Sequence, residues 1–205
     1  IVRYESTAES KYNGFTAELR RAYLGKLQAS IAYTLGKVTD TVPDATNVVL
    51  GGGDDARFQS NPKNFEADRA AGTADVRHRA VFSGLWDMSY FSDSSPVVKA
   101  LLNDWSFSWI AAMQTGLPYS ERVTNDLNND GNRSNDIVPG SRNSHRLPTS
   151  YSVDARLSRK IRLGEKVGLE LIGEAFNLLN STNITSQRDT LYNFTTLAGV
   201  STLVP

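Results

Sequence analysis

The sequence contains no cysteine, and its acidic and basic residues balance at 22 each. The missing cysteine excludes a disulfide framework, a thiol nucleophile and a cysteine metal site. The balanced charge gives the chain no electrostatic preference for nucleic acid, so no nucleic-acid partner is expected. A length of 205 residues suffices for one domain with a core or for part of a larger protein.

Long apolar runs are missing too. The longest is Trp109–Met113, far below the ~20 residues that a membrane helix needs. Transmembrane β-strands escape this test, because their lipid-facing and lumen-facing residues alternate and the hydropathies cancel. The chain begins at Ile1 without a methionine or a signal peptide and ends at Pro205 after a stretch typical of a loop, so both ends are expected to be cut.

What the sequence does have is a period of two. In Leu27–Gly36 every second residue from Leu27 is apolar, and most of the residues between are polar or small, as in a strand with one apolar face. Strands of about ten residues are longer than those usual in globular sheets and match a tilted bilayer crossing. The pattern predicts six of them: Tyr12–Arg21, Leu27–Gly36, Val76–Met88, Trp105–Gly116, Tyr151–Leu163 and Val167–Phe176.

The links between these strands differ in length. Tyr23–Lys26 and Leu163–Lys166 are typical of tight hairpins with glycine in the turn, and one medium link carries a short helical segment at Val97–Leu102. Gly36–Asp75 and Gly116–Ser150 are long loops. Every second link of an up-and-down sheet lies at the same end, so the long loops should share one rim, as in outer-membrane barrels.

The pattern therefore favours an all-β fold, an antiparallel up-and-down transmembrane β-barrel segment. A secreted β-sandwich that binds carbohydrate or calcium is the rival interpretation. Long strands, uneven loops and small residues opposite the aromatic face count against the sandwich. Aromatic residues at or near strand ends would form interfacial girdles in a barrel and core in a sandwich; they are Trp86, Tyr90, Phe91, Trp105, Trp109 and Tyr119.

One loop has the oxygen spacing of a calcium site. Hard cations need several oxygen ligands that converge around a sharp turn, which Gly131 would permit. Ile137 stands where an EF-hand loop has its bidentate glutamate, and a solvated, Asx-rich surface loop explains the composition equally well. The candidate metal ligands are Asp126, Asn128, Asp130 and Asp136, and Ca²⁺ is the cofactor that they suggest.

Nothing else predicts chemistry, and the chain is not expected to be an enzyme. His78 is interpreted as a polar residue at a strand rim, and the other histidine, His145, lies in a long loop. Glu170 and Glu174 share a strand face about 13 Å apart, too far for paired acid–base catalysis. They are expected to line a polar lumen and pair with Arg156 or Lys160 on the neighbouring strand.

Six short strings stand out in order between about Tyr12 and Asn183. They are Tyr33-Thr-Leu-Gly-Lys37 with Asp40, Asp75-Val-Arg-His-Arg79 with Val81 and Ser83, Gly116-Leu-Pro-Tyr119, Asp126-Leu-Asn-Asn-Asp-Gly131, Asp154-Ala-Arg-Leu-Ser-Arg-Lys160, and Glu174-Ala-Phe-Asn-Leu-Leu-Asn180 with Asn183. Together they resemble the motifs SYTWSKxxD, DxRHRxVxS, GxPY, DxNxDG, DxRLSK and EAFNLxNxxN of Oar-like TonB-dependent receptors.

That resemblance implies that residues 1–205 are the C-terminal part of an outer-membrane barrel of about 22 strands. The plug and an N-terminal regulatory-like domain would lie outside the sequence. The implied function is to form part of the wall of a receptor for energised uptake of a ligand, for cell-surface adhesion, or for both. The implied partners are outer-membrane lipid, the missing strands and plug of the same chain, and a TonB-type energy-coupling protein that engages an absent N-terminal region. The implied location is a Gram-negative outer membrane.

Overall fold

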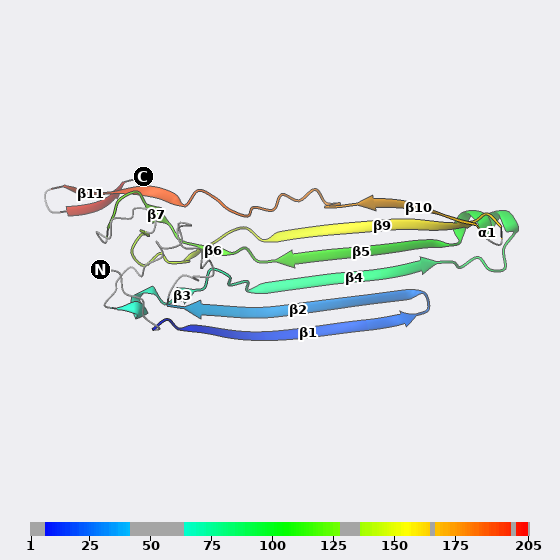
Figure 1. Cartoon of the computed structure of the whole chain (residues 1–205), viewed down its shortest axis with the longest axis horizontal. Coiled ribbons are helices and arrows are strands. Elements are labelled where there is room, and N and C mark those ends of the chain that lie inside the picture. Colours follow the sequence, from blue (N-terminus) through cyan, green and yellow to red (C-terminus); the bar gives the residue numbers. More distant parts are fainter. Residues whose placement is uncertain (1–6, 42–63, 128–135, 165–166, 198–199, 205) are drawn as a thin grey trace.

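The computed structural model describes residues 7–41, 64–127, 136–164, 167–197 and 200–204. Its main feature is an open sheet whose long strands lie side by side in one layer (Figure 1). The order across the sheet is β1-β2-β4-β5-β9-β10, and the short β3 pairs beside β2. The bounds are β1 Ser10–Leu24, β2 Leu27–Asp40, β3 Ala70–Ala71, β4 His78–Met88, β5 Trp105–Gln114, β9 Ser150–Arg162 and β10 Gly168–Ala175.

The pairing confirms the predicted up-and-down order. Each neighbouring pair in the sheet is antiparallel. β5 lies beside β9, as the sequence predicted for Trp105–Gly116 and Tyr151–Leu163. Boundaries differ by a few residues, most at β2, which continues past Gly36 to Asp40. Residues 37–40 pair with β1, and the last two of them also pair with β3.

The sheet has a turn end and a loop end. At the turn end, β1 and β2 are joined at Gly25 and Lys26, whose φ angles of 60° and 70° are those of a two-residue type I′ turn. The same end carries the β4–β5 link with helix α1, Pro96–Leu102, which confirms the predicted helical segment (Figure 1). The described parts of both long loops lie at the opposite, loop end, as predicted.

Side-chain alternation gives the sheet two different faces. Ile31 of β2 lies in register with Phe82 of β4, which lies in register with Ala111 of β5, so apolar residues share one face across the strands. We call this the apolar face: Leu27, Ile31, Phe82, Trp86, Phe107, Trp109, Leu157 and Leu171. The other, polar face carries Ser30, Ser83, Asp87, Ser106, Ser108, Asp154, Arg156, Glu170 and Glu174.

No second layer buries the apolar face within the described residues. Ile31 is 48% exposed and Leu171 50% exposed. The buried apolar side chains of the described part, Val123 and Leu147, belong to the loop end instead. A sandwich would bury the apolar face between two sheets. The described part of the chain therefore does not form the rival sandwich.

Smaller elements gather at the loop end. β6 (Pro118–Tyr119) pairs with β8 (His145–Arg146), and a 3-10 helix, η2, covers Phe65–Asp68. β11 (Thr190–Leu197) forms an antiparallel hairpin with β12 (Val200–Val204) and pairs in parallel with β7 (Arg122–Val123). The interpretation of the C-terminal stretch as a loop is wrong, because its threonine, tyrosine, phenylalanine and valine residues favour strands.

Two aromatic rings cover glycines within the sheet. A Cβ on Gly84 would stand 2.1 Å from Cζ2 of Trp109, its cross-strand neighbour on the apolar face. On the polar face the Tyr12 ring lies over Gly14 and Gly36, which are paired with each other. A ring over a strand glycine replaces the packing that the missing side chain would have supplied. Both contacts help to fix the register of the strands.

Among the described residues, no helix is both long and apolar enough to span a membrane.

Candidate functional site: the polar face and the loop rim

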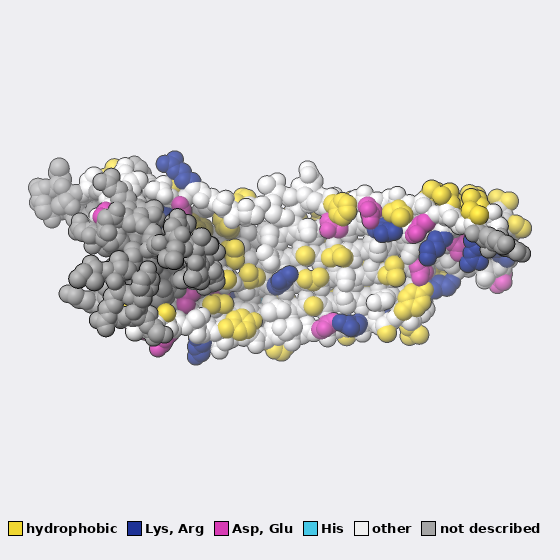
Figure 2. Space-filling view, viewed as in Figure 1, with side chains coloured by type: hydrophobic (Ala, Val, Ile, Leu, Met, Phe, Trp, Pro, Cys, Tyr) yellow, Lys and Arg dark blue, Asp and Glu magenta, His cyan; other side chains and the backbone are white. Residues whose placement is uncertain are grey.

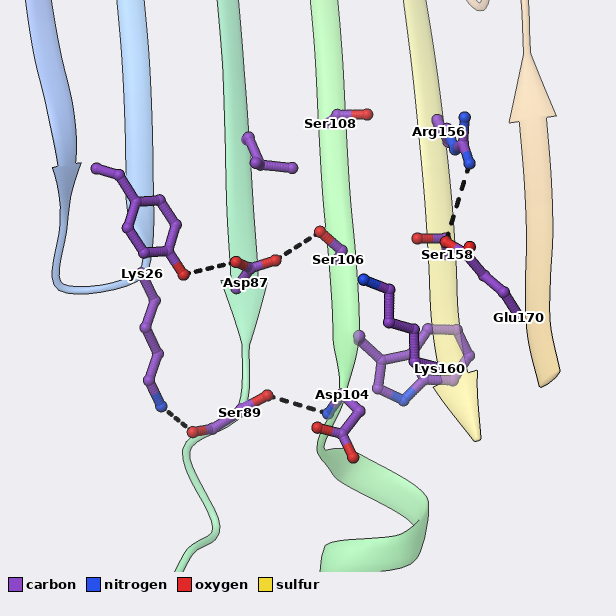
Figure 3. A pocket seen from close by; sticks show the side chains of 13 residues that line it. Lys26, Asp87, Ser89, Asp104, Ser106, Ser108, Arg156, Ser158, Lys160 and Glu170 are labelled. Atoms are coloured by element: carbon purple, nitrogen blue, oxygen red, sulfur yellow. Dashed lines mark hydrogen bonds and ion pairs between the residues drawn. The ribbon is translucent and has the colours of Figure 1, made fainter. Parts of the chain in front are cut away.

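The polar face is held together by hydrogen bonds between strands. At the turn end, Asp87 accepts hydrogen bonds of 2.6 Å from both Tyr23 and Ser106, so one carboxylate joins β1, β4 and β5 (Figure 3). Farther along, the hydroxyls of Ser30 and Ser83 are 2.9 Å apart across β2 and β4. Polar groups on this face are therefore paired across the sheet, as cross-strand neighbours are in general.

Charged side chains from the last two long strands meet on the same face. Arg156 of β9 lies 3.6 Å from Glu174 and 3.9 Å from Glu170, both of β10 (Figure 3 draws the second contact). The predicted pairing of these glutamates is confirmed for Arg156. Lys160 lies opposite Glu170 in the register. Charged side chains are spread along the side of the sheet seen in Figure 2.

Two hollows adjoin each other on this face. One, of about 480 Å³, lies at the turn end and includes Lys26, Asp87 and Lys160. The other, of about 570 Å³, lies nearer the middle of the strands and includes Asp154 and Glu174. Arg156, Leu85 and Ser108 border both. Together they form a groove lined by serine and by charges of both signs, suited to water and polar solutes.

At the loop end, Asp75 is the centre of a buried charge cluster. Its side chain is fully buried, and it accepts hydrogen bonds from Nε of Arg77 at 2.6 Å, from the backbone N–H of Val38 at 2.5 Å and from Arg146. Arg146 also donates to the carbonyls of Asp75 and Gly116. The arginine of one long loop thus binds the aspartate of the other.

Arg142 makes a second link between the same loops. Only 8% of its side chain is exposed, and it forms an ion pair with Asp40 at the end of β2. It also donates to the carbonyls of Asp40, at 3.0 Å, and Asp68, at 2.6 Å. We call the cluster of Asp40, Asp68, Asp75, Arg142 and Arg146 the loop rim.

The ionisation of Asp75 reflects this environment. Burial by itself raises the pKa of this carboxyl, but the hydrogen bonds from Arg77, Val38 and Arg146 favour the charged form more strongly. The net result is a pKa below the usual range for aspartate. Asp75 is therefore a stable carboxylate at neutral pH and a firm anchor for the arginines.

The proposed calcium ligands fall only partly within the described residues. Asn128 and Asp130 lie outside them. Asp126 is half-buried, whereas Asp136 is 5% exposed, because its carbonyl accepts from Val123 and the following Ile137 bridges to Arg122. Asp136 is thus not part of a solvated surface, as the alternative interpretation of this string as a surface loop expected. Among the described residues, no three acidic, histidine or cysteine side chains gather as a metal site.

The two histidines have separate partners. His78 stands at the start of β4, where its Nδ1 lies 2.7 Å from the hydroxyl of Tyr33. His145 lies 3.4 Å from Glu121 and beside the ring of Tyr119. The interpretation of His78 as a residue at a strand rim is confirmed.

Comparison with known proteins decides the family. The model of the outer membrane beta barrel domain matches residues 1–140, more than half of the chain. The chain belongs to the outer membrane beta barrel domain family. Neither the curated proteins nor the solved structures contain a significant match. This beta barrel domain lies in the outer membrane, so its apolar face is the side that meets lipid.

The Glu174–Asn183 string has a structural role in the beta barrel domain. β10 ends at Ala175, and the segment after it caps the remaining edge of β9. The side chain of Asn183 pairs with both the N–H and the carbonyl of Tyr151, each at 3.0 Å. Ser181 donates to the same carbonyl at 2.6 Å. Side chains thus take the place of backbone pairing where β10 has ended.

Sequence reasoning missed the arginines of the loop rim. Arg142 and Arg146 stand in a loop rich in asparagine and serine, where they resemble ordinary solvated residues. Their partners Asp40 and Asp75 are 102 and 71 positions away. The only sequence signal was Asp75 itself, which begins the string Asp75–Arg79. The sequence pattern also gave no role to Arg159, which lies on the apolar face opposite Trp105.

Proposed function

We propose that this beta barrel domain forms part of the wall of a TonB-dependent receptor of the Oar-like kind, which takes up a polar ligand. The observation that carries the proposal is the open, one-layer sheet with one lipid-compatible face and one face of serines and paired charges. In a large barrel the second face lines a lumen through which polar solutes can pass. The six strings that resemble the receptor family supply the finer assignment.

The domain organisation proposed here treats residues 1–205 as a partial barrel. Within the described residues, β1 and β10 each have a neighbour on one side only. A strand edge left open in lipid exposes backbone groups at a cost of several kcal/mol for each group. Further strands of the same chain would cover both edges. In this proposal the receptor also contains a plug and an N-terminal regulatory-like domain, and it works with a TonB-type energy-coupling protein.

The proposal assigns the chain transport and no catalysis. The polar face carries charges of both signs, and Arg156 lies near both Glu170 and Glu174, so the face would provide a wet lining. The loop end would face outside and the turn end the periplasm, as in barrels with long outer loops. Ca²⁺ held by Asp126, Asn128, Asp130 and Asp136 stays part of the proposal, as a weak site in the outer loop.

Two deletion strains of the source bacterium test this function. One lacks the full-length protein and the other lacks the energy-coupling protein. Mass spectrometry of spent medium should find at least one polar solute that the parent consumes and that both strains leave behind. Complementation with full-length Arg156→Gln should slow uptake of that solute at an unchanged amount of protein in the outer membrane, because Arg156 borders both hollows. If the two strains share no unconsumed solute, energised uptake is wrong.

Cell-surface adhesion is a second candidate, favoured by the loop rim. Buried ion pairs hold the described parts of the two long loops together, and such a rim suits contact with another macromolecule. Adhesion of the parent and of the first deletion strain to a surface coated with cells of the same species separates the candidates. An adhesion defect with normal uptake would favour this role.

A further inference from the structure

Helix α1 is a short amphipathic helix with an exposed apolar side. Val97 is 66% exposed, Leu101 58% and Leu102 48%. With half-buried Val98, they occupy one side of the helix at helical spacing, and Lys99 borders that side. Seven residues do not form a stable helix in water by themselves. Ser95 caps this one, and the indole N–H of Trp105 donates to the carbonyl of Leu101 at 3.0 Å.

Arg159 lies on the apolar face beside Trp105, the residue that binds this helix. It is in register with Trp105, and its guanidinium carbon lies 5.2 Å from the centre of the Trp105 ring. Its Nε is buried and has no hydrogen-bond partner in the described part of the chain. None of the described carboxylates forms an ion pair with Arg159. A cation on the lipid side without a partner is costly, so a ligand is expected to supply the missing acceptor.

Neighbouring residues have the composition of a membrane interface. The indole of Trp86 donates to the hydroxyl of Tyr90 at 2.7 Å, and the ammonium of Lys26 lies 4.8 Å from the centre of the Tyr90 ring. Amphipathic aromatic rings of this kind prefer the headgroup region. Figure 2 shows hydrophobic side chains gathered around α1 beside basic ones.

We propose that α1, Trp105 and Arg159 form an interfacial anchor that binds the phosphate of a phospholipid in the inner leaflet. The apolar side of α1 would enter the acyl region and continue the lipid-contacting face of the sheet. Arg159, held against Trp105, would donate to the phosphate oxygens, which match the fork of a guanidinium. The choice of leaflet rests on the proposed function, because it takes the turn end as periplasmic.

A lipid fits this surface better than a protein partner does. The surface continues a face that already meets lipid, and it is a rim of a few side chains rather than a groove. Basic residues also outnumber acidic ones at the described turn end outside the polar face. Arg21, Lys99 and Arg159 are the basic residues that neither line the turn-end hollow nor lie on the polar face, and Asp93 is the acidic one.

Native mass spectrometry of the full-length protein tests the anchor. The wild type, Arg159→Gln and Arg162→Gln are extracted in mild detergent with phosphatidylglycerol and lipopolysaccharide supplied together. Arg162 is the matched control because it stands on the same strand but on the polar face. Retained phosphatidylglycerol should fall roughly tenfold in Arg159→Gln, the loss expected for a charge-assisted contact. It should stay unchanged in Arg162→Gln.

A second measurement keeps the test decisive if Arg159→Gln fails to assemble. A fluorophore on Leu101→Cys should be quenched by nitroxide-labelled phospholipid headgroups and acyl chains more strongly than one on Ala100→Cys, on the other side of α1. Equal quenching at both positions, or equal lipid retention in all three proteins, overturns the anchor. Retention of lipopolysaccharide instead overturns the assigned leaflet. If the uptake experiment fails, the expected lipid retention by Arg159 is unchanged. Failure of the proposed function can therefore be told apart from failure of the anchor.

Discussion

At the scale of single residues, the structure depends on a few close contacts, and only some of them can be predicted from the sequence. Asp75 stood out in the sequence only as the first residue of the string Asp75–Arg79. Its partner Arg146 could not be predicted, because the pair forms only when two long loops fold against each other. Gly84 gave no signal either, because the ring that covers it belongs to the next strand.

Asp75→Asn should loosen the loop rim. The change leaves Arg77 and Arg146 without their carboxylate, and breaking a buried pair costs about 3–5 kcal/mol. We expect about 2–4 kcal/mol, because both arginines keep some contact with water. Hydrogen exchange of residues 70–77 and 141–147 measures the opening free energy. Glu66→Gln is the control, because its ion pair with Arg69 is exposed, and it should change nothing measurable.

The same contact should make the loop rim sensitive to acid. The pKa of Asp75 is lower in the folded protein than in the unfolded chain, so its stabilising effect is complete above the unfolded value of about 3.9. It is lost as the pH falls through the lower, folded value. Exchange in the wild type should therefore accelerate below about pH 4, and Asp75→Asn should not show this step. An identical step in both proteins would contradict the assignment.

Gly84→Ala should disturb the sheet, whereas Gly173→Ala should not. The new Cβ at position 84 would collide with Trp109, and overpacking of this kind costs about 1–3 kcal/mol. At Gly173 the nearest atom would be 3.9 Å away, an ordinary contact. Thermal unfolding of the full-length variants in detergent compares the two. Equal midpoints would show that Trp109 does not pack on Gly84.

Calcium should protect the loop from Asp126 to Asp136 against proteolysis if the oxygen spacing of the sequence forms a site. The ligand string offers only hard oxygen donors, and without a bidentate glutamate a millimolar affinity is expected. Calcium is titrated into the full-length protein and into an Asp126→Ala, Asp130→Ala double variant. Protection of the first alone supports the site. If calcium protects the loop in neither protein, or equally in both, the loop does not form a calcium site.

At the scale of elements, alternation was a reliable guide. It predicted the six long strands, their sequential pairing and the common end of the long loops, because a period of two leaves little freedom in which face a strand buries. It could not predict β11 and β12, because the polar residues of Thr190–Val204 do not fall at every second position and so define no face. It also could not indicate depth in the membrane, which depends on the register between strands.

The register between strands predicts that the free-energy cost of an arginine substitution differs along the apolar face. Leu171 lies in the row of Arg159 and Trp105 near the turn end, whereas Ile31 lies opposite Phe82, near the middle of the strands. Ile31→Arg should therefore cost about 2–4 kcal/mol and Leu171→Arg about 0–1 kcal/mol. Folding of the full-length variants into bilayers under denaturant titration measures both. A larger penalty for Leu171→Arg than for Ile31→Arg would show that Leu171, not Ile31, lies near the middle of the membrane.

At the scale of the whole molecule, the described chain is an amphipathic wall with two open edges. It has almost no buried apolar core of its own, and soluble monomers rarely expose an apolar face of this size. Lipid on one side and water on the other explain both facts. The loop rim then joins the two long loops at one end, and α1 with its aromatic neighbours marks the other.

Nitroxide labels along β5 of the full-length protein in bilayers test this account most directly. Collisions with oxygen report contact with lipid, and collisions with a water-soluble nickel chelate report contact with water. Oxygen contact should peak at Trp105, Phe107, Trp109, Ala111 and Met113 and fall at the residues between. Ile110 is the decisive position, because it is apolar but lies on the polar face, opposite Ser83 and Asp154. Low oxygen contact at Ile110 is the predicted result, and an oxygen maximum there, or no alternation along β5, would contradict the account.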